Sequence, residues 1–219
     1  MKFLTPPDVS SSIPKTDTPG INDQDTAADF SIACRDQLFD ILAGYLSIQD
    51  EFNPEVGFAP RTGIRKAGQK FTVRPRPGEN ISWIREFRPD VEIEYITDQQ
   101  NTRVTRLLEI GGAIELQDSS ILFFQRSANF ERLVAPFEIR PGQSIAPGDY
   151  QFEQYVAFFS SDRSRMFSTE LRGSKGSFFD GHKDSYRVGF RFSPATNLEP
   201  RFSGITTTSP CLQGTSPPL

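Results

Sequence analysis

Very few residues in this chain have the types and spacing that catalysis would need. Glu92 and Glu94 lie two positions apart, so an extended strand would place both carboxylates on one face, as in the carboxylate pair of a glycosidase. Glu109 and Glu115 form a second carboxylate pair, and arginines such as Arg172 belong to the same repeated polar face. One surface of mixed charge explains all of these residues, whereas an active site explains only two of them. We therefore expect no catalytic residues and no enzyme.

The sequence lacks the residues that metal binding, nucleophilic catalysis and nucleotide binding usually require. The only histidine, His182, lies beside an Asp-Gly turn signal, and the only cysteines, Cys34 and Cys211, stand near opposite ends of the chain. No Gly-rich phosphate loop, nucleophile elbow or calcium loop occurs in the sequence. We expect no metal or cofactor, and the binding residues are unknown. The formal net charge of −4 also argues against nucleic acid as a partner.

The most basic segment is residues 60–66, with Arg61, Arg65 and Lys66. One interpretation is a solvated turn. The other is a cationic cluster that pairs with the acidic strand faces.

The polar residues belong to segments in which apolar and polar side chains alternate, the pattern of β-strands with two unlike faces. In residues 186–192 one face reads Tyr, Val, Phe, Phe and the other reads Arg, Gly, Arg. Residues 108–116 and 167–173 alternate in the same way. The candidate strands are 39–48, 67–76, 81–97, 103–117, 120–131, 150–160, 165–175, 184–193 and 198–203. We expect residues 67–203 to form one antiparallel meander.

Two membrane architectures and one soluble one compete for these strands. No run approaches the ~18–20 apolar residues of a membrane helix, which excludes a helical membrane protein. Strands of about ten residues with one aromatic face favour an outer-membrane β-barrel wall over a soluble sandwich. The connections between strands also favour a barrel, which has short turns at one end and longer loops at the other. Short connections at 77–80, 118–119, 161–164 and 194–197 alternate with longer ones at 132–149 and 176–183.

The barrel interpretation assigns directions to individual side chains. The lipid-type face should carry Phe167, Leu171, Tyr186, Val188, Phe190 and Phe192, and the opposite face Glu170, Arg172, Arg187 and Arg191. The aromatic residues expected near strand ends, as interfacial girdles, are Trp83, Tyr95, Phe130, Tyr150, Tyr155 and Tyr186. We expect an all-β antiparallel meander that forms part of an outer-membrane-type β-barrel, as an open, strongly curved sheet.

The ends of the chain differ from its middle. Residues 1–28 and 204–219 are rich in Pro, Ser and Thr, which predicts disordered segments on either side of a partial barrel domain at 29–203. The amino terminus lacks the apolar run of ~7–15 residues of a signal peptide. A barrel must be exported, so we expect this chain to be a piece of a longer exported polypeptide.

Several short motifs occur in an order that resembles a known family. The first and most specific is FNPEVGFAPRT at residues 52–62. The others are Ser82–Arg85, Phe130–Leu133, Pro136–Ile139, Ile145–Tyr150 and Gly176–Gly181. Over residues 29–203 the chain resembles domain-of-unknown-function family 5916, a carboxyl-terminal outer-membrane barrel-like domain that follows a module resembling family 9 carbohydrate-binding modules.

The resemblance implies a role but transfers no catalytic residues. It implies a non-enzymatic membrane anchor or pore in the outer membrane, serving a carbohydrate-binding parent protein. The partners would be outer-membrane lipid and, through an amino-terminal module that is missing here, glycans. The alternative from another class is a soluble β-sheet module that binds carbohydrate on its aromatic faces.

Overall fold

The computed structural model describes residues 6–16, 25–53, 61–193 and 201–206, the last range as backbone only. These residues form an all-β fold with thirteen strands and one short 3-10 helix at Gly78–Ile81. The strands are β1 (Asp8–Ser12), β2 (Ala27–Arg35), β3 (Phe39–Ile48), β4 (Ile64–Val73), β5 (Ile84–Asp98), β6 (Arg103–Leu116), β7 (Ile121–Leu133), β8 (Phe137–Arg140), β9 (Gln143–Ile145), β10 (Gly148–Ser160), β11 (Phe167–Phe178), β12 (Gly181–Phe192) and β13 (Arg201–Thr206). No helix in the described ranges has the length and apolar character needed to cross a membrane.

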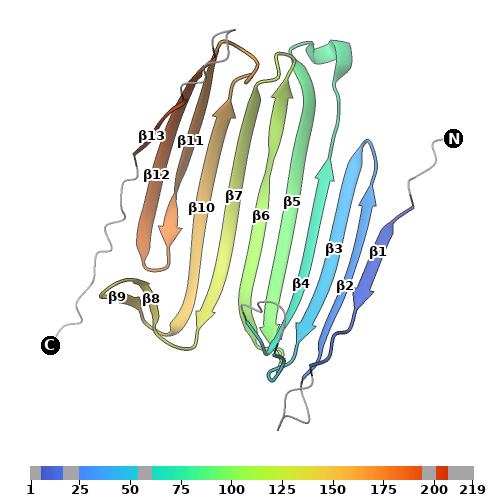
Figure 1. The fold of residues 1–219 in the computed structure, drawn as a ribbon, viewed down its shortest axis with the longest axis vertical. Helices are drawn as coiled ribbons and strands as arrows, with labels where there is room; N and C mark the ends of the chain where they lie inside the picture. Colours follow the sequence, from blue (N-terminus) through green and yellow to red (C-terminus); the bar gives the residue numbers. More distant parts are fainter. Residues whose placement is uncertain (1–5, 17–24, 54–60, 194–200, 207–219) are drawn as a thin grey trace. The chain divides into compact units, whose positions relative to one another are not determined.

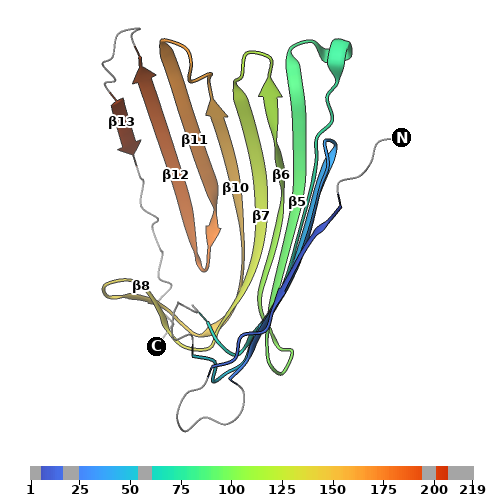
Figure 2. The ribbon, with the colours of Figure 1, turned by 45° about the vertical axis from the view of Figure 1, so that its right-hand side comes forward.

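Eleven of these strands follow one another in a single antiparallel meander (Figure 1). The order is β1 to β7 and then β10 to β13, so β7 pairs directly with β10. The intervening strands β8 and β9 pair with each other as a separate hairpin. Figures 1 and 2 both show β10, β11 and β12 side by side. The expected all-β meander is therefore confirmed.

The two ends of the strand order are β1 and β13, and the sheet is not closed. The open sheet is thus confirmed. The expected strong curvature was wrong, because the sheet is not strongly curled. A strong curl accompanies the pairing of first and last strands in a closed barrel, and this strand order contains no such pair.

Regular structure extends beyond the range that the sequence patterns gave. Strand β1 lies inside residues 1–28, where we expected disorder, and pairs with β2 through partners such as Val9 and Ile32. The hydroxyls of Ser10 and Ser31 also lie 2.7 Å apart. A serine-rich strand gives little hydrophobic signal, and the backbone ladder along β2 is enough to hold it. Strand β13 likewise runs past residue 203, whereas residues 1–5, 17–24 and 207–219 of the predicted disordered ends lie outside the described residues.

The predicted alternation of short and long connections was wrong. Only Phe179 and Asp180 separate β11 from β12, where a long loop at 176–183 was expected. The cause is Gly176, which was interpreted as a loop residue but is paired with Gln154 of β10 within the sheet. A Cβ at this position would press on the backbone carbonyl of Glu153 and lie 2.7 Å from the Cα of Gln154. Glycine here permits close approach of two strands rather than a loop.

The chain divides into two compact units. Unit 1 comprises residues 1–72, 91–108 and 129–149, and unit 2 comprises residues 73–90, 109–128 and 150–219. The buried apolar cluster of unit 1 contains Ala27, Ile48, Ile64 and Ile96, with Leu46, Phe52 and Val104 packed against it. Unit 2 holds the hairpin β11–β12, whose two faces carry the strongest sequence signal.

Candidate functional site

The register of β11 and β12 places the predicted apolar residues on one face. Phe167 is opposite Phe192, Leu171 is opposite Val188, and Gly173 is opposite Tyr186. Because side chains on directly opposed residues point to the same side of a sheet, these residues share one surface with Phe190. We call it the apolar face of unit 2, made of Phe167, Leu171, Tyr186, Val188, Phe190 and Phe192. The predicted grouping is confirmed.

The apolar face is exposed. Phe190 is 61% exposed and Val188 is 42% exposed, so no second layer of described residues covers them. The rings of Phe167 and Phe192 pack with their centroids 4.7 Å apart, which is lateral packing within the face. A soluble antiparallel sheet would normally bury such a face against another layer.

The opposite face of the same hairpin is polar, as predicted. It carries Glu170, Arg172, Arg187 and Arg191, which alternate with the apolar residues in register. Between the charges lie Ser168 and Ser174, both buried, and the Ser174 hydroxyl lies 2.6 Å from that of Ser185. Glu170 accepts an ion pair from Arg163 at 3.2 Å.

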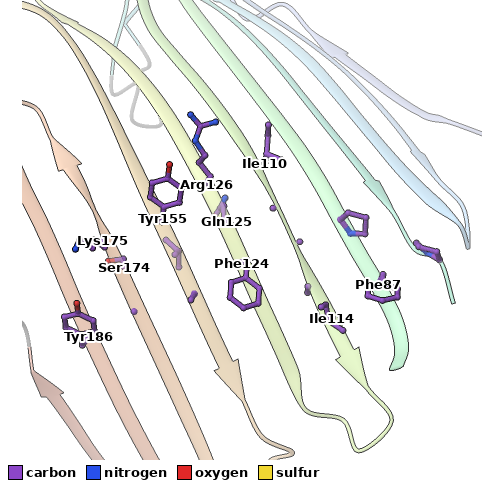
Figure 3. Close-up of a pocket in the computed structure, with 18 residues that line it drawn as sticks. Phe87, Ile110, Ile114, Phe124, Gln125, Arg126, Tyr155, Ser174, Lys175 and Tyr186 are labelled. Carbon is purple, nitrogen blue, oxygen red and sulfur yellow. The ribbon is translucent and has the colours of Figure 1, made fainter. Parts of the chain in front are cut away.

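A groove of about 750 Å³ lies in unit 2 (Figure 3). Its walls include Phe124, Tyr155 and Tyr186, whose rings lie on β7, β10 and β12 in Figure 3, together with Ile110 and Phe87. Small residues separate these rings. Ala157 and Gly173 are opposite each other in the β10–β11 register and line the groove between Tyr155 and Tyr186. We call this feature the apolar groove.

Two cations and no carboxylate line the apolar groove. Arg126 is bound to Glu153 by two contacts, Nη2 to Oε1 at 2.6 Å and Nε to Oε2 at 3.2 Å, and the Tyr155 hydroxyl donates to Oε2. Lys175 is exposed, and no ion pair joins it to another residue in the described part of the chain. Asp184 lies opposite Lys175 in the register but is not a lining residue. The groove is therefore apolar with positive charge beside its tyrosines.

Unit 1 contains a second, smaller groove of about 350 Å³ with a different character. Lys66 Nζ lies 2.6 Å from Glu94 Oε2, and Lys70 Nζ lies 2.9 Å from Glu92 Oε2. The two carboxylates thus lie on one face, as predicted, and each contacts a lysine on β4. We call this feature the charged groove. Each of its two carboxylates is paired with a lysine, as expected for a surface of mixed charge rather than for a catalytic pair.

The remaining predicted polar residues are also paired. Glu115 contacts Arg85 at 2.8 Å and Arg88 at 3.6 Å, and Glu109 accepts a hydrogen bond from the Gln125 side chain. His182 is exposed, with Nδ1 3.1 Å from the carbonyl oxygen of Gly181. Among the described residues no cluster of three or more His, Cys, Asp or Glu side chains is placed to hold a metal ion.

The basic segment pairs with acidic and polar partners, as the second of its two interpretations proposed. Arg61 contacts Glu131 at 3.3 Å, and Arg65 donates to Asn101 Oδ1 at 2.7 Å. Lys66 belongs to the charged groove. Pro60, the first residue of the basic segment, lies outside the described residues.

The prediction that six aromatic residues lie near strand ends was only partly correct. Trp83 directly precedes β5 and is 61% exposed, and Tyr95 lies near the other end of β5. Tyr155 and Tyr186, by contrast, lie in the middle of β10 and β12. Phe130 is 1% exposed beneath the guanidinium of Arg103, 3.6 Å from its ring centroid. Spacing along the sequence could not distinguish a buried ring from a rim one.

An aromatic cluster in unit 2 was missed by the sequence reasoning. Phe152 packs against Phe178 and Phe179 with centroid distances of 5.8 and 5.2 Å, and Tyr150 lies 5.2 Å from Phe179. The consecutive phenylalanines before the Asp-Gly pair were its only signal. The cluster surrounds the tight turn between β11 and β12 and links that turn to β10.

Local hydrogen bonds lower the pKa values of two aspartates in the turns of unit 2. The amide and hydroxyl of Ser120 hold the pKa of Asp118 below its ordinary value, and the amide contact to Oδ1 measures 3.0 Å. The hydroxyl and amide of Ser164 lower the pKa of Asp162 in the same way. Arg165 Nη2 lies 3.0 Å from Asp118 Oδ2. These carboxylates organise turns.

Comparison with known proteins gives no relative. No family model, no curated protein and no solved structure matches the chain. The resemblance to domain-of-unknown-function family 5916 stays a prediction, and residues 54–60 of its first motif lie outside the described residues.

Proposed function

We propose that this chain is a non-enzymatic part of an outer-membrane β-barrel wall, with the apolar face of unit 2 against lipid. The observation that carries the proposal is the exposure of Val188 and Phe190 on a face whose reverse side carries Arg187 and Arg191. Barrel walls alternate apolar residues toward lipid with polar residues toward the lumen.

The dimensions of the apolar face support this assignment. Its rows run from Phe167 opposite Phe192 to Gly173 opposite Tyr186. Six residue steps along a strand span about 20 Å. The apolar band of an outer-membrane barrel is ~25 Å tall. A membrane could therefore cover the whole face.

Energetics support the same assignment. Removing a Val, Leu or Phe side chain fully from water is worth about 1.5–3 kcal/mol each. Five members of the face, Phe167, Leu171, Tyr186, Val188 and Phe190, are more than 40% exposed. Water is thus a poor solvent for this surface, and lipid is a good one.

The role in a parent protein follows from the resemblance. The chain would act in the outer membrane as an anchor or pore for a protein whose other module binds glycans. Its direct partner would be lipid. Mixed-charge faces such as the charged groove would then line water.

Folding in the presence and absence of vesicles tests the proposal. Urea-unfolded chain is diluted into phospholipid vesicles or into plain buffer, followed by circular dichroism and vesicle flotation. We expect a β spectrum and co-flotation with vesicles, and aggregation in buffer because the open sheet has two unpaired edges. A monodisperse monomer by light scattering, with cooperative thermal unfolding and no detergent, would contradict the proposal and favour the soluble carbohydrate-binding module.

A further inference from the structure

We infer that the apolar groove of unit 2 binds one phospholipid with a net negative headgroup, its acyl chain along the groove and its phosphate at Lys175. The inference rests on the proposed function and deepens it, because it states which lipid the wall prefers and where. The evidence is the shape, the charge and the tyrosines of the groove.

The shape fits a chain rather than a compact ligand. The groove is open along an exposed sheet face and crosses several strands. Ala157 and Gly173 form a low strip between the rings of Tyr155 and Tyr186. A Cβ added to Gly173 would meet only the Tyr186 ring, at 3.6 Å, so this strip has free space above it. A methylene chain can lie there in contact with aromatic walls.

The charge fits an anionic headgroup. Lys175 is opposite Tyr155 in the β10–β11 register and lines the groove, so a cation lies at the margin of the apolar strip. Glu153 occupies the donors of Arg126 and does not line the groove. Lys175 is therefore the cation available to a phosphate, and Arg126 adds a second positive charge nearby.

Although Tyr155 and Tyr186 lie in the middle of their strands, Tyr186 is opposite Gly173 in the last row of the apolar face, which is where a membrane covering that face would end. Tyr155 points its hydroxyl to Glu153, and its ring lines the groove, so one end of the side chain is polar and the other apolar. Tyrosines and lysines at such boundaries lie at headgroup level in membrane proteins. A phosphate beside Lys175 would thus lie at the depth where lipid phosphates are found.

The test measures which phospholipid the folded chain retains. The chain is folded in dodecyl maltoside micelles, checked by circular dichroism, and titrated with phosphatidylglycerol or phosphatidylcholine under native mass spectrometry. We expect one retained phosphatidylglycerol, bound about tenfold more tightly than phosphatidylcholine, as for one added charge-assisted contact.

Matched variants locate the site. Lys175→Ala should lower phosphatidylglycerol affinity to that of phosphatidylcholine, whereas Lys183→Ala, on the opposite face of β12, should change nothing. Ala157→Phe should weaken retention of both lipids by filling the strip, and Ala157→Ser should not.

Each outcome decides one of the two claims. Equal retention of both lipids by the wild-type chain, equal effects of Lys175→Ala and Lys183→Ala, or full retention by Ala157→Phe would overturn the lipid site. Selective retention in micelles without insertion into vesicles would overturn the barrel-wall proposal and leave the groove assignment standing. A chain that forms no β structure in micelles would overturn both.

Discussion

The charged groove of unit 1 and the apolar groove of unit 2 are built from the same alternating strands but differ in what completes them. In unit 1, Lys66 and Lys70 each hold a carboxylate within 3 Å. In unit 2, Lys175 has no ion pair among the described residues, and the neighbouring rings are exposed. The first surface is satisfied by its own residues. The second leaves its apolar side chains exposed among the described residues.

The two surfaces differ because charged residues lie opposite one another on neighbouring strands in unit 1, whereas apolar residues do so in unit 2. Adjacent strands β4 and β5 carry opposite charges on one face, so they pair across the ladder. The apolar face of β11 and β12 has no such complement, because its favourable interaction is removal from water. Substitutions that place a charge on the apolar face, or remove one from a polar face, should therefore have different effects on stability.

The largest effect is expected from placing a charge on the apolar face. Phe190→Arg should destabilise the membrane-folded protein by ~2–4 kcal/mol if the residue lies at mid-bilayer depth. Arg191→Ser, one residue away on the polar face, should cost much less. Denaturant titration in lipid vesicles measures both. Equal costs for the two variants would show that the faces are wrongly assigned.

A smaller loss is expected where β11 approaches β10 most closely. Gly176→Ala should destabilise the fold by about 1–3 kcal/mol, because the new Cβ meets the backbone of Glu153 and Gln154. Gly173→Ala on the same strand meets only the Tyr186 ring and should be nearly neutral. Chemical denaturation of both variants in micelles gives the comparison, and a harmless Gly176→Ala would refute the close approach.

Periodicity predicted the strands well because each has one apolar and one polar face. All nine predicted strands, which correspond to β3–β7 and β10–β13, lie within three residues of their predicted bounds. The pattern also gave the faces of Phe190 and Arg191, since period two decides direction once the strand is known. The same periodicity was enough to predict that Glu92 and Glu94 lie on one face of their strand.

What could not be predicted depends on contacts between distant residues. Strand β1 has a weak pattern and exists through its ladder with β2. Gly176 looked like a loop residue because a sequence does not show how closely a neighbouring strand approaches. The apolar groove was also invisible, since Ala157 and Gly173 come together only through the β10–β11 register. The aromatic cluster around Phe179 has the same origin.

The charged groove should respond weakly to loss of one ion pair. Glu94→Gln removes the carboxylate that Lys66 contacts at 2.6 Å, and both side chains remain partly exposed. We expect a loss of at most about 1 kcal/mol. Lys175→Met in unit 2 should leave stability unchanged, because no partner loses its cation. Thermal denaturation in micelles tests the pair, and a larger loss from Lys175→Met would break the comparison.

The smallest expected effect is on how the stability of the protein changes at acidic pH. The folded-state pKa values of Asp118 and Asp162 are lowered, so their stabilising contribution is present above the ordinary carboxyl range of about 4 and is lost as pH falls through the folded values. Asp118→Asn and Asp162→Asn should therefore reduce stability at neutral pH slightly and flatten its decline below pH 4. Unfolding measured between about pH 2 and 7 checks the slope. An unchanged acid slope would contradict the assigned hydrogen bonds.

A nitroxide scan along β12 tests the central claim most directly. Cys34 and Cys211 are first replaced by serine, and single cysteines are then introduced and spin-labelled at positions 186–192 in vesicle-folded protein. If the apolar face of unit 2 contacts lipid, labels at 186, 188, 190 and 192 will collide with dissolved oxygen more than with a polar nickel chelate, and labels at 187, 189 and 191 will do the reverse. A scan with no two-residue alternation, or one in which all seven labels favour the polar reagent, would contradict the membrane assignment.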